Sequence, residues 1–148
     1  MCGIAGFLSP GDMGIAEVND VVGRMTSSLA HRGPDDSGHW IDQAGVVALG
    51  HRRLSVIDLS PEGHQPMRSA CDRYVLVFNG EIYNHRSLRG ELAGTVRFRG
   101  HSDTEVLLAA FTRWGVEATL PRLNGMFALA VWDETSRRLQ LARDRFGE

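Results

Sequence analysis

The sequence of 148 residues is 43% hydrophobic and 23% charged, with a formal net charge of −2, values typical of one soluble globular domain. It contains neither a basic stripe nor a run of about 18 apolar residues, so we expect no nucleic-acid partner, no membrane partner and a cytoplasmic location. Its two cysteines and six scattered histidines match no disulfide framework and no metal-ligand spacing, so we expect no metal site.

The N-terminal residues 2–8 form a short apolar stretch that ends in a turn cluster and predicts a strand. Cys2 directly follows Met1. If Met1 is removed, Cys2 carries a thiol and a free amine whose pKa is roughly 7.7–8.0, and such an amine activates the nucleophile in some hydrolases. The alternative is a structural cysteine buried at the start of a strand.

The next segment, residues 15–30, places apolar side chains at helical spacing and predicts a helix. Residues 31–38 are rich in turn-forming and polar residues, so we expect an ordered loop that is a candidate for the site. Two strands are then predicted at 38–42 and 46–51.

The strongest predicted strand spans residues 74–78, a continuous apolar run that we expect to be buried on both faces. The run ends at Asn79-Gly80-Glu81, which suits the rim of an active site. The Asn79 amide and the Gly80 backbone N–H fit the donors of an oxyanion hole. The alternative is a simple turn, which is the commonest meaning of Asn-Gly.

The C-terminal half predicts a helix at 86–92 and a short strand at 95–99. A capping box at 102–105 then begins a second helix. A strand at 126–132 is followed by its hairpin partner at 138–143. Hairpins outnumber strand-helix-strand units, so we predict an α+β fold with antiparallel sheets and segregated helices.

Three charged side chains are candidates for binding a substrate. Arg53 has the planar fork that binds a carboxylate through two parallel bonds, although it competes with Arg52 and with the reading of a solvated arginine. Glu81 and Asp103 are suited to hold an ammonium group. For Asp103 the alternative is a carboxylate favoured by the helix dipole, and both roles are compatible. Cys71, in a turn, is read as a spectator.

Taken together, several separate stretches resemble the glutamine-hydrolysing domain of asparagine synthetases, within the class II glutamine amidotransferases. The matching stretches run in order from the first residue to the last, and they are Met1-Cys2-Gly3-Ile4-Ala5-Gly6, His31-Arg32-Gly33-Pro34-Asp35, Arg53-Leu54-Ser55-Val56-Ile57-Asp58, Asn79-Gly80-Glu81-Ile82-Tyr83-Asn84-His85, Ser102-Asp103-Thr104-Glu105, Gly125-Met126-Phe127-Ala128 and Arg143-Asp144-Arg145-Phe146-Gly147.

This resemblance implies an N-terminal-nucleophile hydrolase fold, a four-layer αββα sandwich with two antiparallel sheets. It also implies that Cys2 is the nucleophile and that Asn79 and Gly80 form the oxyanion hole. The implied substrate-binding residues are Arg53, the backbone groups of Leu54, Ser55, Val56 and Ile57, and the carboxylates of Glu81 and Asp103, with Asn79 and Gly80 lining the same pocket.

The implied activity is glutamine hydrolysis through a Cys2 thioester, with the ammonia used for ATP-dependent amidation of aspartate. Residues 1–148 are then one glutaminase domain, incomplete at its C-terminus and without the synthetase domain. That domain, in cis or in trans, would be a partner, as would a second copy in a homodimer. The glutaminase half needs no cofactor, whereas ATP and Mg²⁺ belong to the absent half. The alternatives are another carboxylate acceptor, such as a polysaccharide precursor, or a catalytically silent interaction domain.

Overall fold

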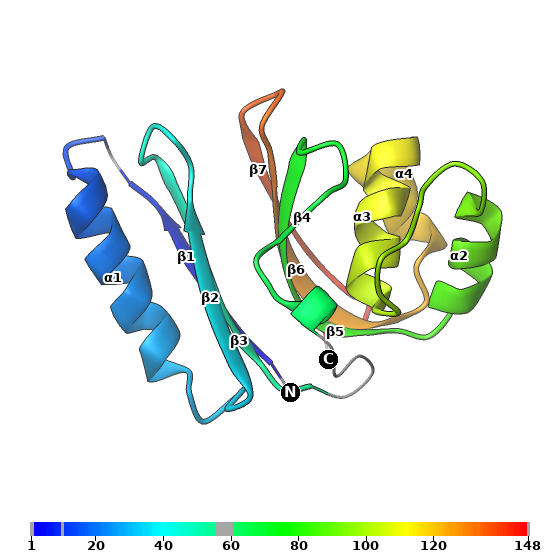
Figure 1. Ribbon diagram of the computed structural model, residues 1–148, viewed down its shortest axis with the longest axis horizontal. Coiled ribbons are helices and arrows are strands. Elements are labelled where there is room, and N and C mark those ends of the chain that lie inside the picture. The colour runs from blue at the N-terminus through cyan, green and yellow to red at the C-terminus, as the bar shows by residue number, and fades with distance from the viewer. Residues whose placement is uncertain (1, 10, 56–60, 148) are drawn as a thin grey trace.

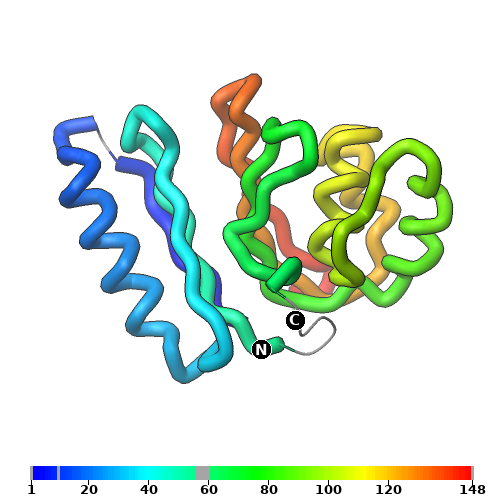
Figure 2. Tube along the Cα trace, in the orientation of Figure 1, coloured from blue at the N-terminus to red at the C-terminus, as the bar shows by residue number. Residues whose placement is uncertain are grey.

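The computed structural model describes residues 2–9, 11–55 and 61–147. Two antiparallel sheets face each other, with one helix outside the first sheet and the other helices outside the second (Figure 1). This order of layers confirms the predicted α+β four-layer sandwich. Figure 2 shows that the chain up to residue 55 builds the first helix and sheet, and that the rest builds the second half.

The first sheet contains β1 (Gly3–Leu8), β2 (Asp36–Ile41) and β3 (Val47–Arg53) in the order β1-β3-β2. Helix α1 (Ile15–Ser28) packs Val18 and Val22 against Ala48 on one face of this sheet. Alternate residues of a strand point to opposite faces, so Val47 and Leu49 lie on the other face, toward the second sheet.

The second sheet contains β4 (Met67–Arg68), β5 (Tyr74–Ile82), β6 (Gly125–Asp133) and β7 (Arg138–Arg143) in that order. One face meets the first sheet through a core that includes Val75, Val77, Ala130 and Trp132. The other face packs Tyr74, Leu76 and Phe78 under the helices. The run at 74–78 is therefore buried on both faces, as predicted, because helices cover one side and a sheet covers the other.

The helices of this outer layer are α2 (His85–Leu92), α3 (Asp103–Trp114) and the short α4 (Val116–Thr119). Two 3-10 turns, η1 (Pro61–Gly63) and η2 (Leu120–Arg122), complete the described elements. The predicted capping box begins α3: the N–H of Glu105 donates to Ser102 Oγ at 3.2 Å. The Glu105 carboxylate accepts instead from the N–H groups of Arg99 and Gly100.

Several predicted elements differ from the structure. β2 begins at Asp36 rather than at residue 38, so residues 36–38 of the predicted loop belong to a strand. The strand at 74–78 does not end at Asn79 but runs to Ile82, with Asn79 paired to Ala128 and Gly80 to Phe127. The turn reading of Asn-Gly is therefore wrong, because β6 offers a partner along its whole length. Likewise, β3 continues through Arg53, which pairs with Asp36. The strand predicted at 95–99 is absent from the described structure, where a single bridge joins Ala93 and Val96.

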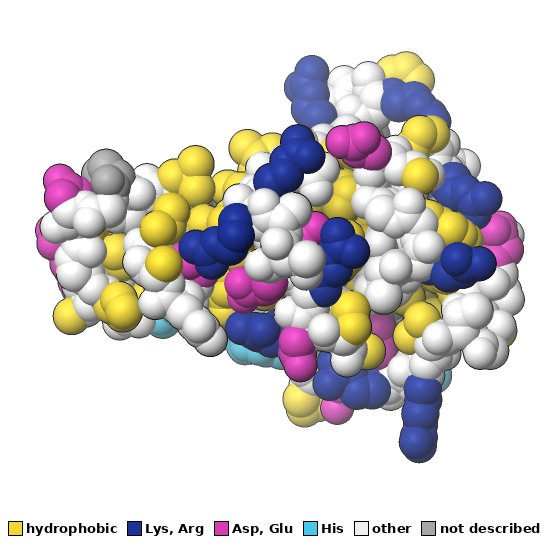
Figure 3. Space-filling view, turned by 90° about the horizontal axis from the view of Figure 1, so that it is seen from above, with side chains coloured by type: hydrophobic (Ala, Val, Ile, Leu, Met, Phe, Trp, Pro, Cys, Tyr) yellow, Lys and Arg dark blue, Asp and Glu magenta, His cyan; other side chains and the backbone are white. Residues whose placement is uncertain are grey.

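On the face seen in Figure 3, arginines and carboxylates are interspersed among hydrophobic side chains. Within the described residues, we find no helix that is both long and apolar enough to span a bilayer.

Candidate active site

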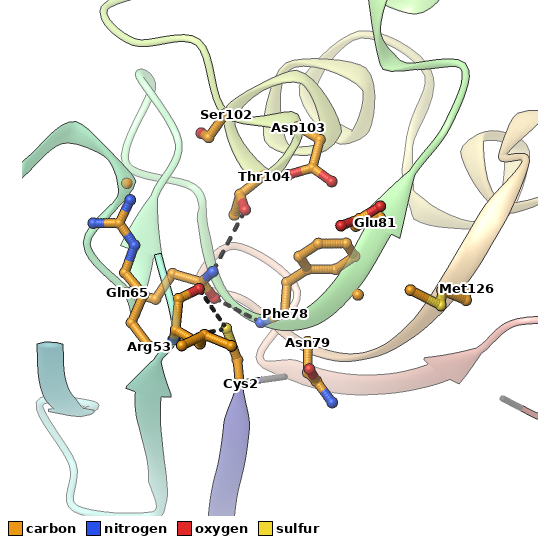
Figure 4. Close-up of a pocket in the computed structure, with 13 residues that line it drawn as sticks. Cys2, Arg53, Gln65, Phe78, Asn79, Glu81, Ser102, Asp103, Thr104 and Met126 are labelled. Atoms are coloured by element: carbon orange, nitrogen blue, oxygen red, sulfur yellow. Dashed lines mark hydrogen bonds between the residues drawn. The ribbon is translucent and has the colours of Figure 1, made fainter. Parts of the chain in front are cut away.

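Cys2 directly precedes β1 and lies beside the end of β3. Gly3 pairs with Arg52, which places Cys2 next to Arg53 and Leu54. The Cys2 sulfur accepts from the N–H of Leu54 at 3.4 Å and lies 3.7 Å from the Leu54 carbonyl oxygen. The side chain is partly exposed, which leaves the thiol accessible. These contacts fix the sulfur at one edge of a cavity that lies between the two sheets and α3 (Figure 4).

This cavity has a volume of about 130 Å³. It gathers residues that are far apart in the sequence, and its lining consists of Cys2, Arg53, Leu54, Gly63, Gln65, Phe78, Asn79, Gly80, Glu81, Ser102, Asp103, Thr104 and Met126. Every predicted catalytic side chain and all three charged binding candidates therefore border one space. In Figure 4, Asp103 and Thr104 come from α3 on one side of this space, and Cys2 lies on the other side, at the N-terminal end of β1.

Arg53 is 8% exposed, so its charge is largely removed from bulk water. It is the last residue of β3, and its guanidinium group lies against Gly63, where a Cβ atom would overlap it. A nearly buried guanidinium beside a cavity is well suited to bind a carboxylate group of a small molecule through paired hydrogen bonds.

The edge of β5 that faces the cavity explains the position of Gly80. Alternate residues of an antiparallel strand direct their N–H groups to the same edge, so Phe78, Gly80 and Ile82 share this one. The Phe78 N–H donates to Gln65 Oε1 at 2.7 Å, and the Ile82 N–H donates to Asp103 Oδ2 at 2.9 Å. By this alternation the Gly80 N–H points to the same edge, between these two bonds, and Gly80 lines the cavity.

A side chain at position 80 is excluded by close packing. The backbone of Gly80 has a φ of +156°, and a Cβ atom there would overlap the carbonyl oxygen of Met126. Because Asn79 precedes Gly80 and also lines the cavity, an amide and a backbone N–H stand side by side. Together they can stabilise an oxyanion that forms on a substrate attacked by Cys2.

Asp103 and Glu81 supply negative charge to the same cavity. Asp103 is 5% exposed, and this burial raises the pKa of its carboxyl group, an effect that the hydrogen bond from Ile82 partly offsets. A cationic ligand group would favour the ionised carboxylate. Asp103 is also the first residue of α3, so its favourable position at the helix N-terminus and a binding role are compatible.

Residues 31–35, the part of the predicted loop that precedes β2, support the cavity from outside. Arg32 donates to the carbonyl oxygen of Cys2 at 3.4 Å, and Arg52 donates to the carbonyl oxygen of Gly33 at 2.8 Å. Asp35 accepts from the N–H of Ser55 at 2.8 Å. The loop thus holds Cys2 and the segment after β3 in place.

The remaining predicted binding residues have different positions. Leu54 lines the cavity, whereas the Ser55 N–H is directed to Asp35. Val56 and Ile57 lie outside the described residues. Cys71, the other cysteine, is exposed in a turn, where its sulfur lies near the hydroxyl groups of Ser69 and Thr112.

Sequence reasoning missed several lining residues. Gln65 and Gly63 lie in a segment without periodicity, and the apolar run around Phe78 predicts only a buried strand. Thr104 belongs to the capping box, which explains the residue locally and does not indicate that it lies beside the cavity. For Gln65 the one available signal was a polar residue before a proline, which is too common to single out.

The arrangement provides a thiol, two oxyanion donors, a guanidinium group and two carboxylates around one small space. This set suits acyl transfer from an amide that carries both an α-carboxylate and an α-ammonium group. Within the described part of the chain, no group of three or more His, Cys, Asp and Glu side chains is arranged to hold a metal ion.

Known proteins provide an independent comparison. The profile of the glutamine amidotransferase domain family matches residues 1–148. Glutamine-hydrolysing asparagine synthetase 3 of Bacillus subtilis is 45% identical over 156 residues, which cover 99% of this chain and 24% of that protein. Amidase chry2 of Gibberella zeae is 40% identical over 155 residues, which cover 99% of this chain and 23% of that protein. The chain thus spans about a quarter of the length of these curated relatives.

A solved structure resembles the whole chain. Glutamine phosphoribosylpyrophosphate amidotransferase of B. subtilis matches with a TM-score of 0.69, covering 99% of this chain and 37% of its own. The sequences are 24% identical, so this likeness shows a shared fold.

Proposed function

This chain belongs to the glutamine amidotransferase domain family, and we propose that it hydrolyses glutamine to glutamate and ammonia through a thioester on Cys2. The observation that carries the proposal is the cavity itself, where Cys2 borders the same small space as Arg53, Asn79, Gly80 and Asp103. Asparagine synthetase relatives with 40–45% identity over nearly the whole chain support it.

In this proposal, Arg53 binds the α-carboxylate of glutamine, and Glu81 and Asp103 bind its α-ammonium group. These contacts place the side-chain amide beside Cys2. The backbone of Leu54, which borders the same cavity, completes the pocket. Each assignment follows the charge of the side chain and its position on the cavity wall.

Before the reaction, hydrolysis of the Met1–Cys2 peptide bond by an aminopeptidase releases Met1 and gives Cys2 a free amine. That amine, acting through a water molecule, takes the thiol proton, and the sulfur attacks the amide carbon. Asn79 and the Gly80 N–H stabilise the resulting oxyanion. The amine returns the proton to the leaving nitrogen, and the C–N bond breaks to release ammonia. Water then attacks the thioester carbon, the C–S bond breaks, and glutamate leaves with the thiol restored.

The test is release of glutamate from glutamine by the chain and by two cysteine variants. We expect Cys2→Ala to abolish release and Cys71→Ser to retain it, because Cys71 lies outside the cavity and serine preserves its polar contacts. Equal release by the wild type and Cys2→Ala would overturn the proposal in favour of a silent interaction domain. Intact mass that still includes Met1 in an active protein would overturn activation by the Cys2 amine.

The proposed half-reaction uses only protein groups and water. We therefore expect EDTA to leave glutamate release unchanged. A loss of release that returns with added Mg²⁺ would contradict this proposal.

We further propose that the ammonia serves ATP-dependent amidation of a carboxylate, with ATP and Mg²⁺ bound by a synthetase domain in the same chain or in another. Aspartate is the first choice because the B. subtilis relatives carry the name asparagine synthetase. The name of the G. zeae relative, an amidase, is the observation that favours a different acceptor. The test uses the longest protein that the gene encodes, incubated with glutamine, ATP and Mg²⁺. Aspartate or another carboxylic acid is added, and the amide that forms identifies the acceptor.

A further inference from the structure

The peptide groups on both sides of Phe78 are held by two side chains from outside its strand. Its N–H donates to Gln65 Oε1 at 2.7 Å. Its carbonyl oxygen lies 3.1 Å from His51 Nε2, and because a carbonyl oxygen only accepts, this ring nitrogen is the donor. Phe78 directly precedes Asn79 and Gly80, so these two bonds lie next to the proposed oxyanion donors.

Side chains are needed at this position because the neighbouring strand is too short. β4 pairs only with Val75 and Leu76, so among residues 2–9, 11–55 and 61–147 no strand lies beside the edge of β5 beyond Leu76. Unpaired backbone groups at a buried position cost free energy comparable to a lost hydrogen bond. Gln65 and His51 are 5% and 1% exposed, and they supply the missing partners inside the core.

His51 also links the two sheets across the site. It lies on β3, where it pairs with Ile4 of β1, two residues before Arg53 on the same face. Its ring therefore spans from the sheet that carries Cys2 and Arg53 to the strand that carries Asn79 and Gly80. Burial lowers the pKa of His51 to about 4, so the ring stays neutral near pH 7 and keeps one donor nitrogen.

Gln65 makes the corresponding link to the helical layer. Its Nε2 lies 3.4 Å from the Thr104 hydroxyl oxygen on α3, next to Asp103 (Figure 4). One amide side chain therefore joins β5 to the helix that provides the proposed ammonium-binding carboxylate.

We propose that His51 and Gln65 are positioning residues, which hold the Phe78 peptide so that Asn79 and the Gly80 N–H stay aimed at the oxyanion formed beside Cys2. This inference rests on the proposed glutaminase function. Preorganised donors act mainly on the transition state, so the loss of either positioning residue lowers kcat more than it raises KM.

The test uses a matched pair of variants at each position. His51→Gln keeps a donor near the position of Nε2, whereas His51→Asn is too short to reach the Phe78 carbonyl. Gln65→Glu keeps an acceptor for the Phe78 N–H, whereas Gln65→Met removes it. For His51→Asn and Gln65→Met we expect kcat for glutamine hydrolysis to fall about 10- to 100-fold with KM within about threefold, less than the loss from removing an oxyanion donor outright. His51→Gln and Gln65→Glu retain most of the rate.

A second measurement distinguishes the loss of oxyanion positioning from a general disturbance of the structure around Cys2. Alkylation of Cys2 by iodoacetamide forms an S–C bond and expels iodide without any oxyanion, so its rate does not depend on the oxyanion donors. We expect that rate to be unchanged in His51→Asn, His51→Gln and Gln65→Met, which add no charge beside the thiol, followed at Cys2 by site-resolved mass spectrometry because Cys71 also reacts.

Three outcomes would overturn the inference. They are wild-type kcat in His51→Asn and Gln65→Met, equal losses within each matched pair, or an alkylation rate that changes together with kcat. Failure of the proposed function is distinguishable, because the wild type would then release no more glutamate than Cys2→Ala.

Discussion

The guanidinium group of Arg53 occupies the space in which a Cβ atom at residue 63 would lie. Arg53 ends β3 and Gly63 ends η1, so two segments that are not adjacent in sequence close around one side of the cavity. The absence of a side chain at Gly63 therefore sets the position of the proposed carboxylate-binding group.

Replacing Gly63 with alanine should displace this guanidinium and weaken glutamine binding. Loss of one charge-assisted hydrogen bond, about 1.5–3 kcal/mol, corresponds to an increase in KM of about 10- to 100-fold. Initial rates over a range of glutamine concentrations will measure it. The matched control is Gly90→Ala on α2, where a Cβ atom meets nothing within 4 Å. That variant should keep its KM and gain about 1 kcal/mol of stability. Equal KM values in both variants would refute the role of Gly63.

Asn79→Ala should lower kcat by about 10²–10³-fold, because it removes one donor to the oxyanion. The KM for glutamine should change little, since the ground-state amide places less negative charge on its oxygen. Steady-state kinetics will separate the two parameters. Asn19→Ala provides the control, because Asn19 is an exposed residue of α1 that contacts His39. A rise in KM without a fall in kcat would assign Asn79 to substrate binding instead.

Asp103→Asn should raise the KM for glutamine by about tenfold or more, because the charge opposite the α-ammonium group is lost. An asparagine oxygen can still accept from the Ile82 N–H, so the fold should be retained. Burial raises the pKa of Asp103, so in the wild type the carboxylate becomes protonated at a higher pH than an ordinary aspartate. Wild-type KM should therefore increase as the pH falls, and the variant should lack this dependence. Parallel pH profiles would contradict the assignment.

His51 should make the stability of the fold depend on pH. Burial lowers its pKa from 6.5 to about 4, an effect that its bond to Phe78 and the charge of Asp36 partly oppose and that Arg53 and His64 reinforce. Below pH 6.5 the unfolded chain binds a proton that the folded chain binds only near pH 4. Stability is therefore full above pH 6.5 and declines toward pH 4, by about 3 kcal/mol from this residue. Denaturant unfolding at several pH values gives the free energy of unfolding as a function of pH. Between pH 4 and 6.5 this free energy should change more steeply with pH in the wild type than in His51→Gln. Identical slopes would exclude the effect.

Local sequence patterns determined most of the strands, the fold class and the candidate site residues. The alternation and the apolar runs of the sequence predicted most of the strands and the antiparallel α+β class, because side-chain periodicity depends only on neighbouring residues. Roles for Cys2, Asn79, Gly80, Arg53, Glu81 and Asp103 were also predicted, because their residue types suit this chemistry and the resemblance of the separate stretches implies the same roles.

Tertiary structure decided what no local pattern contains. Asn79-Gly80 has the composition of a turn, yet β6 keeps it in a strand because strand pairing outweighs local propensity. Gln65 and His51 are ordinary polar residues in the sequence, and they become important only because β4 stops short and leaves the Phe78 peptide without strand partners. The same division holds for Cys2. Its residue type and position in the sequence indicated a nucleophile, whereas the packing of two sheets and a helix placed it beside its proposed partners.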